Sequence, residues 1–149
     1  MSSTPDNLAK TLITHGVKPS VQRIAILEYL QTHYTHPTVE EVYQGLNRQI
    51  PTLSKTTVYN TLRLLAEHNV ALMITLDEHR VCYDGNTKPH VHFMCKKCGR
   101  IFDFMDEPMP MLESNHKMID GNKVDEIQLY YKGVCAECQA KGKAGRAAV

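Results

Sequence analysis

Two Cys-x-x-Cys pairs constrain this chain more than any other feature, because together they require two distant segments to meet. Cys95 and Cys98 form the first pair, and Cys135 and Cys138 form the second. Each pair places two thiolates on one tight turn, and a tetrahedral zinc site takes four such soft ligands. Gly99 follows the first pair and suits a turn with unusual backbone angles. The spacing predicts a structural Zn2+ site with closed coordination; a redox-active dithiol and four unconnected buried cysteines are the alternatives.

The first half of the chain has the pattern of several helices followed by two strands. Favourable N-cap residues precede apolar residues at helical spacing, and prolines separate the segments. We expect a short helix near residues 8–13, further helices opening at Ser20, Thr38 and Ser54, and strands at 70–76 and 80–84. Helices followed by a two-stranded ribbon predict a winged helix-turn-helix.

The second half has a different pattern, and turn-forming residues at 85–89 separate it from the first. Strand candidates lie at 90–95, 100–104 and 125–132, a helix is expected at 111–118, and the small basic tail from 139 is expected to be partly disordered. We therefore predict an α+β fold with an N-terminal winged helix-turn-helix domain at 1–84, a hinge at 85–89, and a small C-terminal α/β domain at 90–149 that holds the four-cysteine site and ends in a flexible tail.

The helix predicted after Ser54 has one apolar and one polar face. Val58, Leu62 and Leu65 form the apolar stripe. The opposite face has side chains that can contact bases and phosphates, namely Lys55, Thr56, Tyr59, Asn60 and Arg63. A formal net charge of +1 does not indicate a nucleic-acid partner by itself. The DNA-binding prediction depends on the helix-turn-helix pattern, and an ordinary solvated helix face is the alternative.

Histidines and aspartates around the predicted hinge suggest a second metal site. His90 and His92 alternate along a predicted strand, so both imidazoles face the same side. Asp84 lies just before the hinge, Asp103 lies on the following strand, and His36 lies far upstream. Histidine with carboxylate ligands suits iron, manganese or zinc. An isolated His-x-His and a simple turn at position 36 are the alternatives.

Five stretches, in order over roughly residues 10–138, resemble the ferric uptake regulator (Fur) superfamily of bacterial metalloregulators. They are GVKPSVQR at Gly16–Arg23, HPTVEEVY at His36–Tyr43, TTVYNTLRLL at Thr56–Leu65, HVHFMCKKCG at His90–Gly99 and GVCAEC at Gly133–Cys138. The resemblance implies a homodimeric repressor of palindromic double-stranded DNA operators, with an N-terminal winged-helix domain and a C-terminal dimerisation domain.

The resemblance also implies the role of individual residues. Structural zinc would be held by Cys95, Cys98, Cys135 and Cys138, a regulatory metal by His36, Asp84, His90, His92 and Asp103, and DNA would be contacted by Lys18, Tyr59, Asn60 and Arg63. One ion joining His36 to the ligands at and beyond the hinge would hold the two halves in a fixed arrangement. That arrangement would present both recognition helices of the dimer to adjacent major grooves.

The regulatory ligands most resemble those of the peroxide sensors (PerR) in this superfamily, because position 103 is aspartate where iron sensors usually have glutamate. This resemblance implies Fe2+ or Mn2+ as corepressor. It also implies that peroxide oxidises His36 or His90 in the iron form, which then leaves DNA. Such a protein modifies only itself and is not an enzyme.

Other functions remain open from the sequence. An iron sensor is one, although an auxiliary site of many iron sensors is missing here, with Val91 between the histidines. A zinc sensor using Cys82, two residues from Asp84, is another. Two alternatives belong to other functional classes. One is a non-haem iron oxygenase, which would need an open coordination position and a substrate pocket. The other is a zinc-stabilised protein-interaction module.

The location is expected to be cytoplasmic, with no membrane partner and no small-molecule substrate. No apolar run approaches the roughly 20 residues that a membrane span needs. The first residues, MSSTPDNLAK, contain no apolar stretch of a secretory signal.

Overall fold

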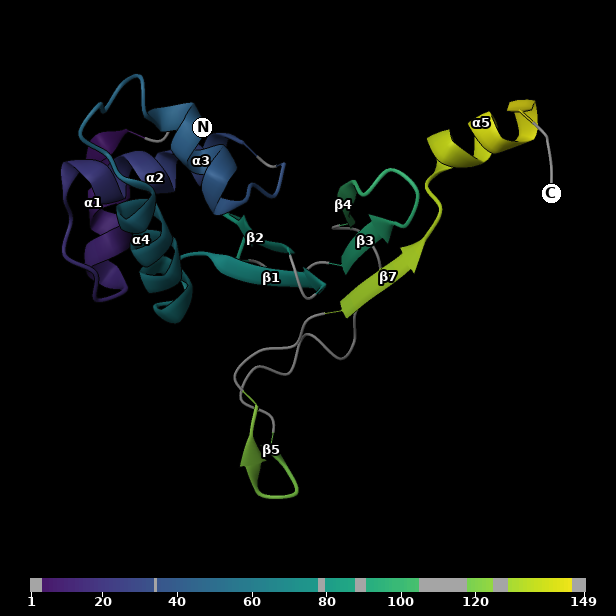
Figure 1. Ribbon diagram of the computed structural model, residues 1–149. Coiled ribbons are helices and arrows are strands. Elements are labelled where there is room, and N and C mark those ends of the chain that lie inside the picture. The colour runs from purple at the N-terminus through teal and green to yellow at the C-terminus, as the bar shows by residue number, and fades with distance from the viewer. Residues whose placement is uncertain are drawn as a thin grey trace. The chain divides into compact units, whose positions relative to one another are not determined.

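The chain divides into two compact units, Met1–Thr87 and Lys88–Val149. The computed structural model describes residues 4–33, 35–77, 80–87, 91–104, 118–124 and 129–145. The first unit contains α1 to α4 followed by a β-hairpin, and the second contains a three-stranded sheet, a small hairpin and α5 (Figure 1). None of the helices in the described part of the chain is long and apolar enough to cross a membrane.

The four helices of the first unit begin where hydroxyl side chains cap them. The caps are Thr4, Ser20, Thr38 and Ser54, whose side chains each accept a hydrogen bond from the backbone N–H three residues on, at 3.0–3.3 Å. A capping box is present at Thr38, with Glu41 as its second member. The helices are α1 (Pro5–Thr14), α2 (Val21–Thr32), α3 (Val39–Leu46) and α4 (Lys55–Glu67).

Aliphatic side chains from these helices form the core of the first unit. The apolar stripe predicted on α4 is confirmed, since Val58, Leu62 and Leu65 are each 0% exposed. Burial of each such side chain stabilises the fold by roughly 1.5–3 kcal/mol. The cluster comprises Leu8, Leu12, Val17, Ile26, Leu27, Leu30, Val42, Leu46, Leu53, Val58, Leu62, Leu65, Val70, Ala71 and Tyr83.

The hairpin of the first unit is the wing. Strands β1 (Leu72–Asp77) and β2 (Arg80–Asp84) are antiparallel, with Ile74 opposite Cys82. The backbone N–H of Tyr83 donates to the carbonyl of Pro37 at 2.9 Å, which fastens the α2–α3 connection to β2. The winged helix-turn-helix prediction is confirmed by this arrangement.

The second unit is built on a mixed sheet with strand order β4-β3-β7. Its strands are β3 (Val91–Cys95), β4 (Ile101–Phe104) and β7 (Leu129–Gly133). β3 is antiparallel to β4 and parallel to β7. A separate hairpin consists of β5 (Met118–Ile119) and β6 (Asn122–Lys123), and the chain continues from β7 into α5 (Ala136–Gly145).

One expectation for the second half needs correction. Met118, the last residue of the predicted helix at 111–118, lies in strand β5; positions 111–117 are outside the described residues. The tail from residue 139 is helical as far as Gly145, and its expected partial disorder stays a prediction because 146–149 lie outside the described residues. The physical reason for the helix is that the second cysteine turn starts it: the Gln139 N–H donates to the Cys135 carbonyl at 2.9 Å.

Candidate metal centres and DNA-binding face

The first cysteine turn joins β3 to β4 and presents two sulfur atoms to one point. Cys95 is the last residue of β3, and its carbonyl accepts from the Gly99 N–H at 2.9 Å. Gly99 has φ 75°, the left-handed conformation that favours glycine, as the sequence predicted. The Cys98 N–H lies 3.4 Å from the Cys95 Sγ. Backbone geometry therefore aims an N–H group at a sulfur that can ligate a metal.

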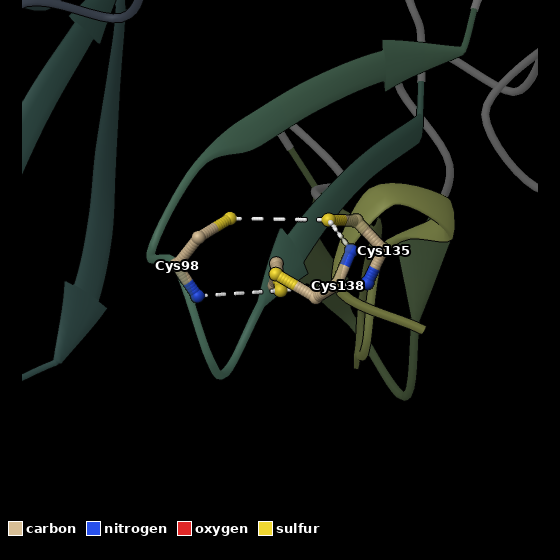
Figure 2. Close-up of side chains that lie close together, drawn as sticks. Cys98, Cys135 and Cys138 are labelled. Atoms are coloured by element: carbon tan, nitrogen blue, oxygen red, sulfur yellow. Dashed lines mark hydrogen bonds between the residues drawn. The ribbon is translucent and has the colours of Figure 1, made fainter. Parts of the chain in front are cut away.

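The parallel pairing of β3 with β7 brings the second cysteine turn to the first. Cys95 is in register with Gly133, and the Lys96 N–H donates to the Gly133 carbonyl at 2.7 Å. The Cys135 N–H then lies 3.4 Å from the Cys95 Sγ. Figure 2 shows Cys98, Cys135 and Cys138 facing one another, with 3.9 Å between the sulfurs of Cys98 and Cys135.

The four sulfurs fit a tetrahedral metal ion. All four lie within 4.8 Å of one another, and zinc–sulfur bonds of about 2.3 Å in a tetrahedron need sulfurs roughly 3.8 Å apart. Among the described residues of this unit only Val91, His92, Cys95 and Cys135 are buried. A unit with so small a core is of the kind that a structural metal stabilises. The structure thus brings together the four cysteines that the sequence predicted.

The thiols of this cluster differ in acidity. Backbone N–H groups of Cys98 and Cys135 lower the pKa of Cys95 to about 5, because they stabilise its thiolate. The backbone and side chain of Arg100 lower the pKa of Cys98. Hydrogen bonding with Cys135, together with burial, raises the pKa of Cys138 to about 12. Four adjacent thiolates repel one another, so complete deprotonation calls for a cation at their centre.

Arg100 lies beside the cysteine sulfurs and pairs with Glu137, and neither residue was predicted from the sequence. The Arg100 guanidinium lies 3.9 Å from the Cys135 Sγ and forms an ion pair with Glu137. It also lies over the Phe102 ring, 5.1 Å from the centroid. Glu137 in turn pairs with Lys141 at 3.3 Å. The sequence offered one signal for this ion pair: the arginine follows the first Cys-x-x-Cys pair and the oppositely charged glutamate lies inside the second.

A histidine and an aspartate face each other in the sheet of the second unit. His92 on β3 is in register with Asp103 on β4, and the His92 Nδ1 lies 2.9 Å from the Asp103 Oδ1. His92 is 2% exposed, and its ring stacks on Tyr130 of β7 with centroids 5.4 Å apart. His90, predicted to point the same way as His92, lies outside the described residues.

A second histidine and aspartate meet inside the first unit. The His36 Nε2 lies 3.5 Å from the Asp84 Oδ2, although these residues come from the α2–α3 connection and the end of β2. Both side chains are almost fully buried. The Asn86 N–H donates to the Asp84 Oδ1 at 2.9 Å, which orients the carboxylate. Each unit thus has one buried imidazole beside one carboxylate, a donor set that suits iron or manganese but is too small alone to complete a site.

The predicted DNA-contacting residues of α4 all reach solvent. Lys55, Thr56, Tyr59, Asn60 and Arg63 are exposed, and Tyr59 is 47% exposed. A hollow of about 430 Å3 lies between α4 and the segment before α2, with Asn60 on one side and Lys18 on the other. The helix and the preceding arm therefore present polar groups to one surface, as a DNA-binding face requires.

Two cations on this face have carboxylate partners. The Lys55 Nζ lies 2.9 Å from the Glu40 Oε2 of α3, and it also lies 5.5 Å from the centroid of the Tyr43 ring. The Arg63 Nε lies 3.2 Å from the Glu67 Oε1 one turn further along α4. These acidic partners were not predicted.

Comparison with known proteins identifies the family. The model of the ferric uptake regulator family matches residues 14–132. The chain belongs to the ferric uptake regulator family. This membership agrees with the resemblance seen in the sequence and with a winged-helix unit followed by a four-cysteine cluster.

Proteins similar to this Fur-family chain are named as peroxide-responsive regulators and as ferric uptake regulators. The peroxide-responsive repressor PerR of Staphylococcus aureus (strain USA300) is 36% identical over 126 residues, which cover 85% of each chain. The Campylobacter jejuni peroxide stress regulator is 27% identical with TM-score 0.64, covering 89% of this chain and 97% of that one. The Helicobacter pylori ferric uptake regulator, at 23% identity and TM-score 0.66 over 91% and 94%, shares the fold.

The alternatives left open by the sequence can now be weighed against family membership. These relatives are regulators by name and not enzymes, so an oxygenase has no support from them. For a zinc sensor, Cys82 is a buried residue of β2 opposite Ile74, and within the described residues it belongs to no group of potential metal ligands.

Proposed function

We propose that this Fur-family protein is a metal-dependent transcriptional repressor of the PerR type, with Fe2+ or Mn2+ as corepressor and peroxide as the signal. The observation that carries the proposal is a buried histidine beside an aspartate in each unit, His36 with Asp84 in the first and His92 with Asp103 in the second. The relationship to PerR at 36% identity supports the peroxide signal, as does aspartate at position 103.

The regulatory metal would be held by both pairs together with His90, across a hinge at 85–89. Neither pair alone offers enough donors for a stable site, so occupancy would require the winged-helix unit and the sheet unit to adopt one arrangement. When bound, ferrous iron supplies the reactivity toward hydrogen peroxide, and manganese does not. The chain's own part is to present the His36 and His90 rings to the oxidant; their modification would weaken metal binding and release DNA.

The four cysteines would hold a structural zinc ion. Closed coordination by thiolates leaves no position for a substrate, and the role is to fasten α5 and β7 to β3. This assignment is supported by the spacing of the sulfurs and by the N–H groups directed at them.

The DNA contacts would come from α4 and the arm before α2. We assign base and phosphate contacts to Lys18, Lys55, Thr56, Tyr59, Asn60 and Arg63, all of which are exposed. A homodimer on a palindromic operator is supported by the sheet of the second unit, where Phe104, Leu129 and Tyr131 are 44%, 37% and 50% exposed on one face. A repressor of this kind would act in the cytoplasm.

The test is operator binding by purified protein loaded with Fe2+ or Mn2+, before and after low-dose hydrogen peroxide, with mass analysis of the same samples. The operator is a duplex that the Mn2+-loaded protein selects from a random pool. We expect the iron form to lose DNA binding and to gain about 16 Da, one oxygen atom, on a peptide containing His36 or His90. The manganese form should do neither.

Other outcomes separate the alternatives. An iron form that keeps DNA and stays unmodified would point to an iron sensor. Failure to select any duplex would end the DNA-binding proposal. Steady turnover of an organic substrate would support the oxygenase.

A further inference from the structure

The DNA-binding face contains acidic side chains that the proposed function does not use. Glu40 and Glu67 each contact a cation of that face, Lys55 and Arg63 respectively. The side chains of Glu40 and Glu67 are 50% and 58% exposed. Phosphates approaching this surface would therefore meet carboxylates beside two of the cations that are meant to bind them.

The position of Glu67 is unfavourable for the helix itself. It is the last residue of α4, where the helix dipole disfavours negative charge. The i,i+4 ion pair with Arg63 adds only about 0.2–0.5 kcal/mol of helix stability, which the dipole penalty of about 0.3–1 kcal/mol offsets, so helix stability gives little reason for a carboxylate at this position. Its contact in the structure is with the Arg63 Nε at 3.2 Å, so the effect of the carboxylate falls on a DNA-contacting side chain.

Glu40 acts on the other end of the same helix. Lys55 is the first residue of α4, and Glu40 reaches it from α3 at 2.9 Å. Gln44 donates to the Glu40 Oε1 at 3.0 Å and so helps to hold the carboxylate in place. The pKa of Glu40 is lowered and that of Lys55 is raised by their contact, so both groups are charged at neutral pH.

We propose that Glu40 and Glu67 are specificity-determining residues, which hold Lys55 and Arg63 in intramolecular ion pairs and so weaken attraction to non-operator DNA. Non-specific binding depends almost wholly on cations that neutralise phosphates. Exposed ion pairs are weak. An operator can therefore displace the two carboxylates from Lys55 and Arg63, because its base contacts compensate for the lost ion pairs. Random DNA offers no such base contacts and competes less well with the carboxylates. The inference rests on the proposed DNA-binding function.

The experiment compares E67Q and E40Q with the matched control E28Q. All three remove one negative charge, but Glu28 lies at a different hollow, beside Tyr29 and His33. Fluorescence anisotropy would measure binding of the Mn2+-loaded full-length variants to the selected operator and to a scrambled duplex of equal length, from 50 to 200 mM salt. Thermal melting would check folding, since Glu40 also lies in the first turn of α3.

Each cation freed from its carboxylate steepens the slope of log affinity against log salt by up to about 0.9. For each subunit, this corresponds to a change of roughly threefold in DNA affinity between about 50 and 200 mM salt. We expect E67Q and E40Q to bind the scrambled duplex about threefold to tenfold more tightly at 50 mM salt, with a smaller gain on the operator. The ratio of operator to scrambled affinity should fall.

Equal behaviour of E67Q, E40Q and E28Q would overturn the inference while leaving DNA binding intact. A wild-type protein that selects no duplex would instead remove the proposed function on which it rests. E67Q alone decides the question if E40Q proves unstable, because Glu67 caps no helix and its replacement removes the charge that holds Arg63.

Discussion

At the scale of single residues, one cation connects the two cysteine turns from outside the four-cysteine cluster. Arg100 follows the first turn, and Glu137 lies within the second. The same guanidinium lies near the Cys135 sulfur. Such outer partners orient metal ligands and offset the negative charge that four thiolates leave on a zinc ion.

We therefore predict that R100M weakens zinc binding about 10- to 100-fold, the usual cost of losing an outer partner. Competition with a chromophoric chelator on the purified protein would measure it. K96M is the matched control, because it removes an exposed cation from the adjacent first cysteine turn. R100K should retain part of the effect, whereas equal zinc affinity in R100M and K96M would contradict the assignment.

The length of the side chain at position 103 should determine the response to peroxide. Asp103 is held against His92 at 2.9 Å across two paired strands, and one more methylene moves the carboxylate by about 1.5 Å. D103E should keep metal-dependent DNA binding but oxidise about 10- to 100-fold more slowly, since reactions of bound groups are sensitive to displacements near 1 Å. Mass spectrometry over time measures the rate; D6E, in α1, is the control, and an unchanged rate in D103E would argue against this role.

At the scale of elements, α3 lies against α2 at a position where a Cβ would displace the Tyr29 ring. A Cβ on Gly45 would lie 2.4 Å from the Tyr29 Cε2, closer than atoms can approach. The Tyr29 ring is itself stacked on His33, with centroids 3.9 Å apart, so it cannot move without losing that contact. The pairing of these two helices therefore depends on the absence of a side chain at position 45.

G45A should destabilise the first unit by up to about 2 kcal/mol, because overpacking costs about 1–3 kcal/mol and alanine within α3 regains up to about 1 kcal/mol of helix propensity. Urea unfolding followed by circular dichroism would report it. G142A in α5 is the control, because a Cβ there meets only the Lys97 Nζ at 3.7 Å and alanine raises helix propensity by up to about 1 kcal/mol. Equal stability of G45A and the wild type would show that α3 can shift away from Tyr29.

At the scale of the whole molecule, regulation would consist of coupling between metal and DNA. A metal that binds only one arrangement of the two units raises the population of that arrangement, and by linkage DNA must raise metal affinity by the same factor. The two His–Asp pairs have oxygen and nitrogen donors, whereas the cysteine cluster has four thiolates. These donor sets should release their metals under different conditions.

Mild treatment with EDTA should therefore abolish operator binding while zinc stays in the cysteine cluster. Added Mn2+ should restore it. Elemental analysis of the same samples gives the zinc content, and anisotropy gives the DNA affinity. Operator affinity that is the same with and without regulatory metal would refute the coupling.

The sequence by itself determined the features that local patterns encode. The caps at Ser20, Thr38 and Ser54, the apolar stripe of α4 and the four clustered cysteines were all predicted and are present. Hydroxyl caps act within three residues, an apolar stripe repeats every turn, and a Cys-x-x-Cys pair is a single turn. Each is a short-range relation, so it can be recognised before the chain folds.

Tertiary structure alone decided which side chains meet across elements. The partners of His36 and His92 depend on the path of the α2–α3 connection and on the register of β3 with β4. The contacts of Arg100 with Glu137 and of Lys55 with Glu40 join residues whose separation in the sequence has no period. The tail became helix α5 because Cys135 is held against the Cys95 sulfur and its carbonyl starts the first turn. Such contacts follow from packing and strand register, which no local pattern of residues specifies.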